Sequence, residues 1–258
     1  MAIFGNKQEK LEKTYDTGDL KVPVSLGVIM DGNGRWATQR HLPRSAGHKV
    51  GAENLKELCR NCVRYGVKYL TVYAFSTENW ARPQPEVDFL MKLFVELFDK
   101  YDAELAQEGI RVRFTGDDSE LPPKVREVCK TAEERSKERS NMQLIVALNY
   151  GGRREILNSC RILAEQVKAG TLEPSDITEK MISDNMYLPD VPDPELIIRP
   201  SGEMRLSNFL LWESAYSEFW VSDTLWPDFG YEDLTQAFRD YAGRDRRFGG
   251  LSKKESKT

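Results

Sequence analysis

Small, acidic and cationic residues are concentrated between Ser25 and Gly51, in a pattern that could hold a phosphate group. The apolar run Leu26 to Met30 is followed by Asp31 and by the glycine-rich segment 32–34. Glycine lets backbone N–H groups approach an anion closely, and a guanidinium group donates to two phosphate oxygens at once. We therefore favour a phosphate-binding loop over a plain turn between a strand and a helix. The charged side chains and the imidazole of this loop are those of Asp31, Arg35, Arg44 and His48.

Arginines also stand beside the ends of other predicted strands. Arg82 follows the polar cluster 76–79, and Arg199 and Arg205 flank a Ser-Gly turn. Parallel strands that are joined by helices end at the same edge of their sheet, and ligands bind at that edge. Together with the arginines of the first loop, these side chains predict a site for a diphosphate or another doubly charged anion.

Asp31 is the best-placed candidate for a magnesium ligand, because Mg²⁺ combines one or two carboxylates with the phosphates of a substrate. Neither a Walker loop nor a G-x-G-x-x-G pattern with a later acidic residue is present, which argues against P-loop and dinucleotide enzymes. No catalytic triad or nucleophilic cysteine is evident. The pair Asp117-Asp118 could bind magnesium, but a solvated turn before a helix is the favoured interpretation.

The elements that must position these residues alternate between strand and helix. A strand over 26–30, a helix over 50–65 and a strand over 67–75 predict a β-α-β unit with parallel strands. Gly47 stands just ahead of this helix, whose N-terminus would add partial positive charge to the loop. We therefore expect an α/β fold: a single domain with a mostly parallel central sheet of about six strands flanked by helices. The further predicted strands cover 110–116, 142–152 and a short run ending at Arg199, and the further helices cover 122–140, 153–169, 178–185 and 231–241.

The helix predicted over 85–108 carries apolar residues over more than one stripe. Packing on two sides, or at an oligomer interface, is the more frequent reason for such a pattern. The alternative is that the helix forms a wall of an apolar cavity.

The composition excludes several classes of protein. The chain has 258 residues and a formal net charge of −4, so the whole chain is not a nucleic-acid binder by electrostatics. No segment has the apolar length of a membrane span, and no secretory signal is visible, so we expect a cytoplasmic protein. Residues 1–20 are expected to form a flexible arm and residues 251–258 a disordered tail. Cys59 and Cys62 could form a zinc or redox motif, but two small apolar positions on one helix face are favoured.

Six separated motifs resemble those of the cis-prenyltransferase family, and most closely those of its bacterial undecaprenyl diphosphate synthases. The resemblance implies a single domain over 21–250 with an apolar tunnel between the sheet and the helices. It also implies a Mg²⁺-dependent homodimer that condenses isopentenyl diphosphate repeatedly onto an allylic diphosphate, expected to be farnesyl diphosphate. The product would be a long polyprenyl diphosphate, such as the undecaprenyl carrier for cell-wall glycans, through which the protein could contact the inner face of the membrane. The motifs are MDGNGRWA (30–37), GHKVG (47–51), YAFSTENWARP (73–83), NYGGR (149–153), IRPSGEMRLSNFLLW (198–212) and WPDF (226–229).

The resemblance assigns roles to residues at the matching positions. Asp31 matches the aspartate that handles magnesium and the departing diphosphate, and Glu218 matches a second magnesium contact that can come from the partner subunit. Asn79 matches the family's proposed proton acceptor. Because an amide is a weak base, we expect Asn79 to orient a phosphate or water that takes the proton. The remaining matches are Gly32, Asn33, Gly34, Arg35, Trp36, Arg44 and His48 around the allylic diphosphate, Ser76, Thr77, Glu78, Trp80 and Arg82 in the second motif, Arg199, Arg205 and Ser207 for isopentenyl diphosphate, and Arg247 and Gly249 in a C-terminal motif that reaches across the dimer.

Two other classes of function remain open from the sequence. The first is a catalytically silent partner subunit, against which the intact Asp31, Asn79 and arginine set argue. The second is a diphosphate-binding or phosphatase module, for which no nucleophile is evident.

Overall fold

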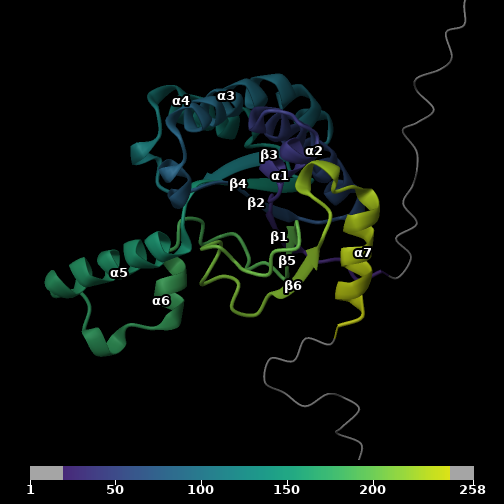
Figure 1. Cartoon of the computed structure of the whole chain (residues 1–258). Helices are drawn as coiled ribbons and strands as arrows, with labels where there is room; N and C mark the ends of the chain where they lie inside the picture. Colours follow the sequence, from purple (N-terminus) through teal and green to yellow (C-terminus); the bar gives the residue numbers. More distant parts are fainter. Residues whose placement is uncertain (1–19, 245–258) are drawn as a thin grey trace, which may run out of the picture.

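Six parallel strands form the central sheet of the chain, for which a computed structural model describes residues 20–244 (Figure 1). The strand order is β3-β4-β2-β1-β5-β6, and every neighbouring pair is parallel. The expected α/β fold with one parallel sheet is therefore confirmed. Most of the expected N-terminal arm, and the whole of the expected C-terminal tail, lie outside the described residues. The strands are β1 (Ser25–Ile29), β2 (Tyr69–Ser76), β3 (Ile110–Thr115), β4 (Met142–Tyr150), β5 (Leu196–Pro200) and β6 (Glu218–Ser222).

Seven α-helices connect or extend these strands within residues 20–244. The crossover from β1 to β2 is the predicted β-α-β unit, and it places the two strands side by side with Val28 opposite Val72. β5 pairs with the other edge of β1, so the connections lead away from β1 in both directions and leave a crevice at the carboxyl ends of the strands. The helices are α1 (Asn33–Gln39), α2 (Arg44–Tyr65), α3 (Gln84–Gln107), α4 (Pro123–Ser136), α5 (Gly152–Lys168), α6 (Glu179–Asp184) and α7 (Tyr231–Ala242).

The main core lies between one face of the sheet and the helices α2, α3, α4 and α7. Alternate strand residues such as Val28 and Val72 point into it, as the two-residue period of a strand requires. Cys59 and Cys62 are fully buried there, and burial raises the pKa of both thiols. They are apolar packing positions, as the sequence indicated. The opposite face of the sheet is covered by residues such as Phe209 and Leu210 from the segment between β5 and β6.

The start of α2 differs from the prediction. The helix begins at Arg44 rather than near Val50, with Pro43 as its N-cap, so Gly47 lies inside it. A Cβ atom at Gly47 would lie 2.0 Å from the backbone oxygen of Asn33 at the start of α1. Gly47 therefore allows two helices to pack closely, and the expectation that it precedes a helix N-terminus beside the phosphate loop is wrong.

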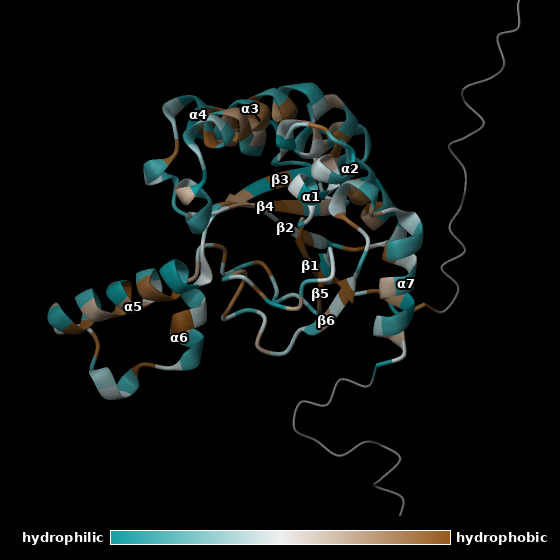
Figure 2. Cartoon of the chain, viewed as in Figure 1, coloured by the Kyte–Doolittle hydropathy of each residue, from teal (hydrophilic) through white to brown (hydrophobic). Residues whose placement is uncertain are grey.

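The helices α5 and α6 project away from the sheet as a pair (Figure 1). Ser159 of α5 donates to the backbone oxygen of Ile182 in α6 at 3.0 Å, which ties the pair together. Figure 2 shows apolar residues on the strands of the sheet and on α3, and also on the projecting α5. Leu157 and Ile162 of α5 are exposed. Within residues 20–244, no helix combines the length and the apolar character that crossing a bilayer requires.

Candidate active site

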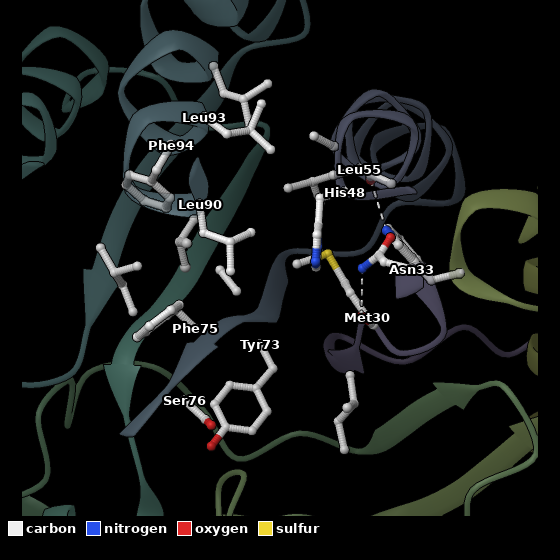
Figure 3. Close-up of a pocket in the computed structure, with 18 of the residues that line it drawn as sticks. Met30, Asn33, His48, Leu55, Tyr73, Phe75, Ser76, Leu90, Leu93 and Phe94 are labelled. Atoms are coloured by element: carbon white, nitrogen blue, oxygen red, sulfur yellow. Dashed lines mark hydrogen bonds between the residues drawn. The ribbon is translucent and has the colours of Figure 1, made fainter. Parts of the chain in front are cut away.

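A cavity of about 390 Å³ lies between the sheet and the helices α2 and α3. Figure 3 shows Leu90, Leu93 and Phe94 of α3 on one side of it and His48 and Leu55 of α2 opposite. Strand residues complete the lining, among them the apolar Phe75, Leu144, Val146 and Leu148.

α3 is apolar over more than one stripe, and both packing against a core and bordering a cavity contribute to this pattern. Val87 and Met91 are buried against Leu121 and Val125, which belong to a separate small core. Met91 also lines the cavity, together with Leu90, Leu93, Phe94, Leu97, Phe98, Tyr101 and Leu105. The helix therefore carries many apolar residues because it packs on a core and also borders the cavity.

One end of the cavity is polar and is built around Asp31 and Arg199. Arg199 Nη2 donates to Asp31 Oδ2 at 2.8 Å, and Arg199 Nη1 donates to Ser207 Oγ at 2.8 Å and to the backbone oxygen of Arg205. Only 4% of the Arg199 side chain is exposed, and its buried Nε has no hydrogen-bond partner within residues 20–244. Because this guanidinium borders the cavity, it is suited to an anion that enters there.

The side chain of Asp31 is ionised at neutral pH. Burial alone would raise its pKa, but the hydrogen bond and charge of Arg199, together with the charge of Arg35, lower the pKa below the ordinary value. Arg35 Nη2 lies 3.5 Å from Asp31 Oδ1, and the same guanidinium donates to the backbone oxygen and the hydroxyl of Ser201 at 3.0 and 2.6 Å. Ser201 thus fixes Arg35 beside Asp31 at the edge of the cavity.

Three of the donors expected from the sequence, Arg44, His48 and Arg82, meet at Glu86, a residue that the sequence did not single out. Arg44 donates to its carboxylate from Nε and Nη2 at 3.1 and 3.3 Å, Arg82 Nη1 donates at 3.1 Å, and His48 Nε2 lies at 3.3 Å. The pKa of His48 is lowered by its burial, and the charges of Arg82 and Arg44 act in the same direction against the raising effect of Glu86. The four-residue spacing of Arg82 and Glu86 at a helix start was the one sequence signal for this contact.

Two glycines of the first motif are explained by close approach. Gly32 has a φ of 105°, a conformation that costs other residues free energy, and a Cβ there would lie 3.0 Å from Leu225. A Cβ at Gly34 would lie 2.6 Å from Arg44 Nη1. Gly34 therefore leaves the space in which the guanidinium of Arg44 lies against α1.

The motif over residues 73–83 divides into residues at the cavity and residues that support it. Ser76 and Asn79 line the cavity, and Asn79 Oδ1 accepts the backbone N–H of Ser76 at 3.1 Å. Trp80 donates from Nε1 to Asn149 Oδ1 at 2.7 Å, and its ring packs on Phe75 with 4.9 Å between ring centroids. Because the oxygen of Asn79 is already engaged, its NH₂ group is the part that can act on a ligand.

Thr77 and Glu78 point toward the segment after β5. Glu78 Oε1 accepts from Asn208 at 2.8 Å, and Thr77 donates to Glu78. Trp36 donates from Nε1 to Asp228 at 2.7 Å and lies outside the cavity lining. These three side chains contribute hydrogen bonds around the site in this structure and do not line the hollow.

The structure separates the two expected magnesium contacts within one chain. Glu218 lies at the start of β6, four residues before the strand ends, and accepts from Arg244 Nη1 at 2.7 Å. Asp31 follows the opposite, carboxyl end of the parallel strand β1, so the two carboxylates belong to opposite edges of the sheet. Arg247 and Gly249 lie outside the described residues.

The donor set at Asp31 fits a magnesium ion that draws most of its oxygen ligands from a substrate. Between residues 20 and 244, no group of three or more His, Cys, Asp and Glu side chains is placed to hold a metal ion. Asp31 is an ionised carboxylate at the cavity, 29% exposed, which is the kind of single protein ligand that Mg²⁺ uses beside phosphates.

Of the residues expected from the sequence, the structure brings most of the charged and polar ones to one end of the cavity. Arg35 and Arg44 approach that end through their contacts with Asp31 and Glu86. The expected site residues that line the cavity are Asp31, Asn33, His48, Ser76, Asn79, Arg82, Arg199, Arg205 and Ser207.

Comparisons with known proteins show which family this chain is similar to. Residues 29–249 match the prenyltransferase family model that describes undecaprenyl diphosphate synthases. The chain is 52% identical to an isoprenyl transferase of Clostridium perfringens over 231 residues, which is 90% of this chain and 91% of the relative. An isoprenyl transferase of Thermotoga maritima is 50% identical over 90% of this chain and 99% of its own length.

Two solved structures are also similar. The first is lavandulyl diphosphate synthase from Lavandula x intermedia in complex with dimethylallyl diphosphate, with a TM-score of 0.86, 36% identity, and coverage of 88% of this chain and 98% of that one. The second is a probable undecaprenyl diphosphate synthase from Campylobacter jejuni, with a TM-score of 0.74, 31% identity, and coverage of 89% and 100%.

Proposed function

Because the chain belongs to the undecaprenyl diphosphate synthase family and is a prenyltransferase, we propose that it condenses isopentenyl diphosphate repeatedly onto an allylic diphosphate with Mg²⁺ as cofactor. The expected primer is farnesyl diphosphate, and the expected product is a long polyprenyl diphosphate that carries cell-wall glycans. The observation that carries the proposal is the ion pair between Asp31 and the buried Arg199 at the polar end of an apolar cavity. This arrangement suits a molecule with a diphosphate head and a hydrocarbon tail.

In the proposed reaction, negative charge develops on the diphosphate that leaves the allylic carbon. A guanidinium group that is already held in place, as that of Arg199 is by Asp31 and Ser207, stabilises such charge without having to reorganise. Arg35, Arg44 and Arg82, with His48, would hold the allylic diphosphate, and Arg199, Arg205 and Ser207 would hold isopentenyl diphosphate. When bound, Mg²⁺ would supply further positive charge to the phosphate oxygens, held on the protein by Asp31.

Asn79 would position the proton acceptor rather than accept the proton itself. Its side-chain oxygen accepts from the backbone of Ser76, so its NH₂ group can donate to a phosphate oxygen or a water. An amide has no basicity near neutral pH, whereas a diphosphate oxygen can take a proton. We therefore assign Asn79 the role of orienting the acceptor.

The apolar part of the cavity would receive the growing chain. Leu90, Phe94 and Leu97 line it on the α3 side and exclude water from the reacting end. We further propose a homodimer, with the exposed Leu157 and Ile162 of α5 as support, and Glu218 as a magnesium contact for the partner subunit. Contact with the inner face of the membrane would be peripheral and through the lipid product.

The test uses the purified full chain with labelled isopentenyl diphosphate, farnesyl diphosphate and Mg²⁺, and it separates the extracted products by chromatography. We expect labelled polyprenyl diphosphates, no product after the metal is chelated, and recovery when Mg²⁺ is added back. Asp31→Asn should reduce turnover by about 100-fold or more, as loss of a key electrostatic group does. The matched control is Asp117→Asn, because Asp117 also follows a strand but accepts from its own turn at Ser119.

Three outcomes separate the candidate functions. Labelled polyprenyl products support the proposed elongation. Binding of the substrates without any product would indicate a silent subunit, and release of inorganic phosphate without carbon-carbon bond formation would indicate a phosphatase.

A further inference from the structure

The carboxylate of Glu86 occupies the place where the proposed function puts a diphosphate. Its two oxygens are contacted by Arg44, Arg82 and His48, the three side chains that the proposed function places around the allylic diphosphate together with Arg35. Arg44 approaches it with two nitrogens, the same fork geometry that guanidinium uses for a phosphate. An internal anion therefore uses the donors that the substrate needs.

These contacts are partly shielded from water. The side chain of Glu86 is 14% exposed and that of His48 is 11% exposed, whereas Arg82 is 33% and Arg44 is 56% exposed. Burial alone would raise the pKa of Glu86, but the hydrogen bond and charge of Arg44, the charge of Arg82 and the hydrogen bond with His48 lower it. Glu86 is therefore an anion at neutral pH, and it repels a second anion that approaches the same donors.

The position of Glu86 in the chain allows it to move aside. It lies in the first turn of α3, next to the segment 77–83 that connects β2 to this helix. The partial positive charge at the N-terminus of a helix stabilises a carboxylate in the first turn, so Glu86 keeps a favourable environment when the arginines turn away from it.

We propose that Glu86 is a displaceable counter-ion that competes with the diphosphate for Arg44, His48 and Arg82. It holds these side chains together in the free enzyme, and the entering diphosphate takes them over. The proposal rests on the proposed function and adds a positioning residue to it. Because Glu86 competes for the same donors, the enzyme binds the diphosphate more weakly than it would without Glu86. This weaker binding favours release of the leaving diphosphate after each condensation.

The opposing possibility is that Glu86 is a clamp that keeps the three donors in a binding geometry throughout the reaction. The two roles predict opposite changes in affinity when the charge is removed. Displacement predicts tighter binding of an anion because a competitor is lost. A clamp predicts weaker binding because the donors lose their anchor.

The experiment measures binding of inorganic pyrophosphate to the full chain by titration calorimetry at fixed pH and ionic strength. We expect Glu86→Gln to bind pyrophosphate about tenfold more tightly than the wild type. In steady-state assays, the same variant should show a lower KM for the allylic diphosphate together with a lower kcat, since product release becomes slower. Unchanged or weaker binding of pyrophosphate by Glu86→Gln overturns the proposal.

Two further variants keep the result interpretable. Glu86→Ala removes the side chain completely; displacement predicts tighter binding here too, whereas a clamp predicts its largest loss of affinity. The matched control is Asp88→Asn, which removes an exposed charge near Glu86 on the same helix. The Asp88 carboxylate accepts from Gln84 at 2.8 Å and is not among the contacts of the three donors. It should bind pyrophosphate as the wild type does. A wild-type chain that binds no pyrophosphate overturns the displacement proposal, and the assay for labelled polyprenyl products then decides separately on the proposed function.

Discussion

Removing Asp31 or removing Arg199 from their ion pair should lower the free energy of unfolding by different amounts. Arg199 is 4% exposed, so Asp31→Ala leaves a buried cation that water cannot reach. Loss of one partner of a buried pair costs about 3–5 kcal/mol. Asp31 is 29% exposed and keeps Arg35 nearby at 3.5 Å, so Arg199→Met should cost less, roughly 1–3 kcal/mol.

The assay is a double-mutant cycle of the free energy of unfolding, measured by urea denaturation with circular dichroism. The double variant has neither the carboxylate of Asp31 nor the guanidinium of Arg199. Its free energy of unfolding should therefore fall by about 1–3 kcal/mol less than the sum of the losses in the two single variants. A solvent-exposed pair serves as the control. Lys180 and Asp184 form an i, i+4 pair with exposures of 79% and 53%, and their coupling should stay below about 0.5 kcal/mol.

Two results would refute the reasoning. The first is additivity of the Asp31 and Arg199 substitutions to within about 0.5 kcal/mol, which would mean that the pair has no net coupling. The second is a larger cost for Arg199→Met than for Asp31→Ala, which would contradict the assignment of Arg199 as the partner that water cannot reach. Both comparisons require equal m-values, since a changed m-value indicates an altered denatured state.

Three more predictions follow from the cavity and the core. Leu90→Trp should shorten the polyprenyl products seen by chromatography, because Leu90 lines the cavity. Phe89→Trp is the control, because Phe89 is outside the lining and its substitution should leave product length unchanged. Unchanged product length in Leu90→Trp would contradict a cavity that binds the hydrocarbon tail. Gly47→Ala should lower the free energy of unfolding by about 2 kcal/mol or more, since its Cβ would lie 2.0 Å from the oxygen of Asn33, and a neutral effect would show that α1 can shift freely. Burial and then the nearby Glu155 carboxylate raise the pKa of Glu213 from 4.5 to about 8. The protonated Glu213 should therefore stabilise the fold fully below pH 4.5, and this stabilisation should decline as the pH rises to about 8. Urea unfolding at several pH values should show a flatter decline for Glu213→Gln, and an equally steep decline would exclude Glu213 as its source.

The sequence predicted the fold well because its local signals agreed with one another. The β-branched and aromatic run that became β2 lies between the helical patterns of α2 and α3, and that alternation leads to parallel strands. Parallel strands end at one edge, so Asp31, Asn79 and Arg199 could be expected together from their positions at or after the ends of strands alone. The early start of α2 was missed because glycines at 47 and 51 obscured the helical pattern. Their lack of a side chain is needed for contacts with α1 and Trp226, which no local pattern reveals.

The sequence by itself determined the alternation of elements, the edge of the sheet that carries the arginines, and the apolar surplus of α3. Only the tertiary structure decided that Arg35 and Arg199 pair with Asp31 while Arg44, His48 and Arg82 pair with Glu86. It also decided that Glu218 lies at the other edge of the sheet from Asp31. The physical reason is that residue periodicity reports which face of an element is buried. The partner of a charged side chain depends instead on how elements distant in the chain pack together, as with Arg44 and Glu86, which are 42 residues apart.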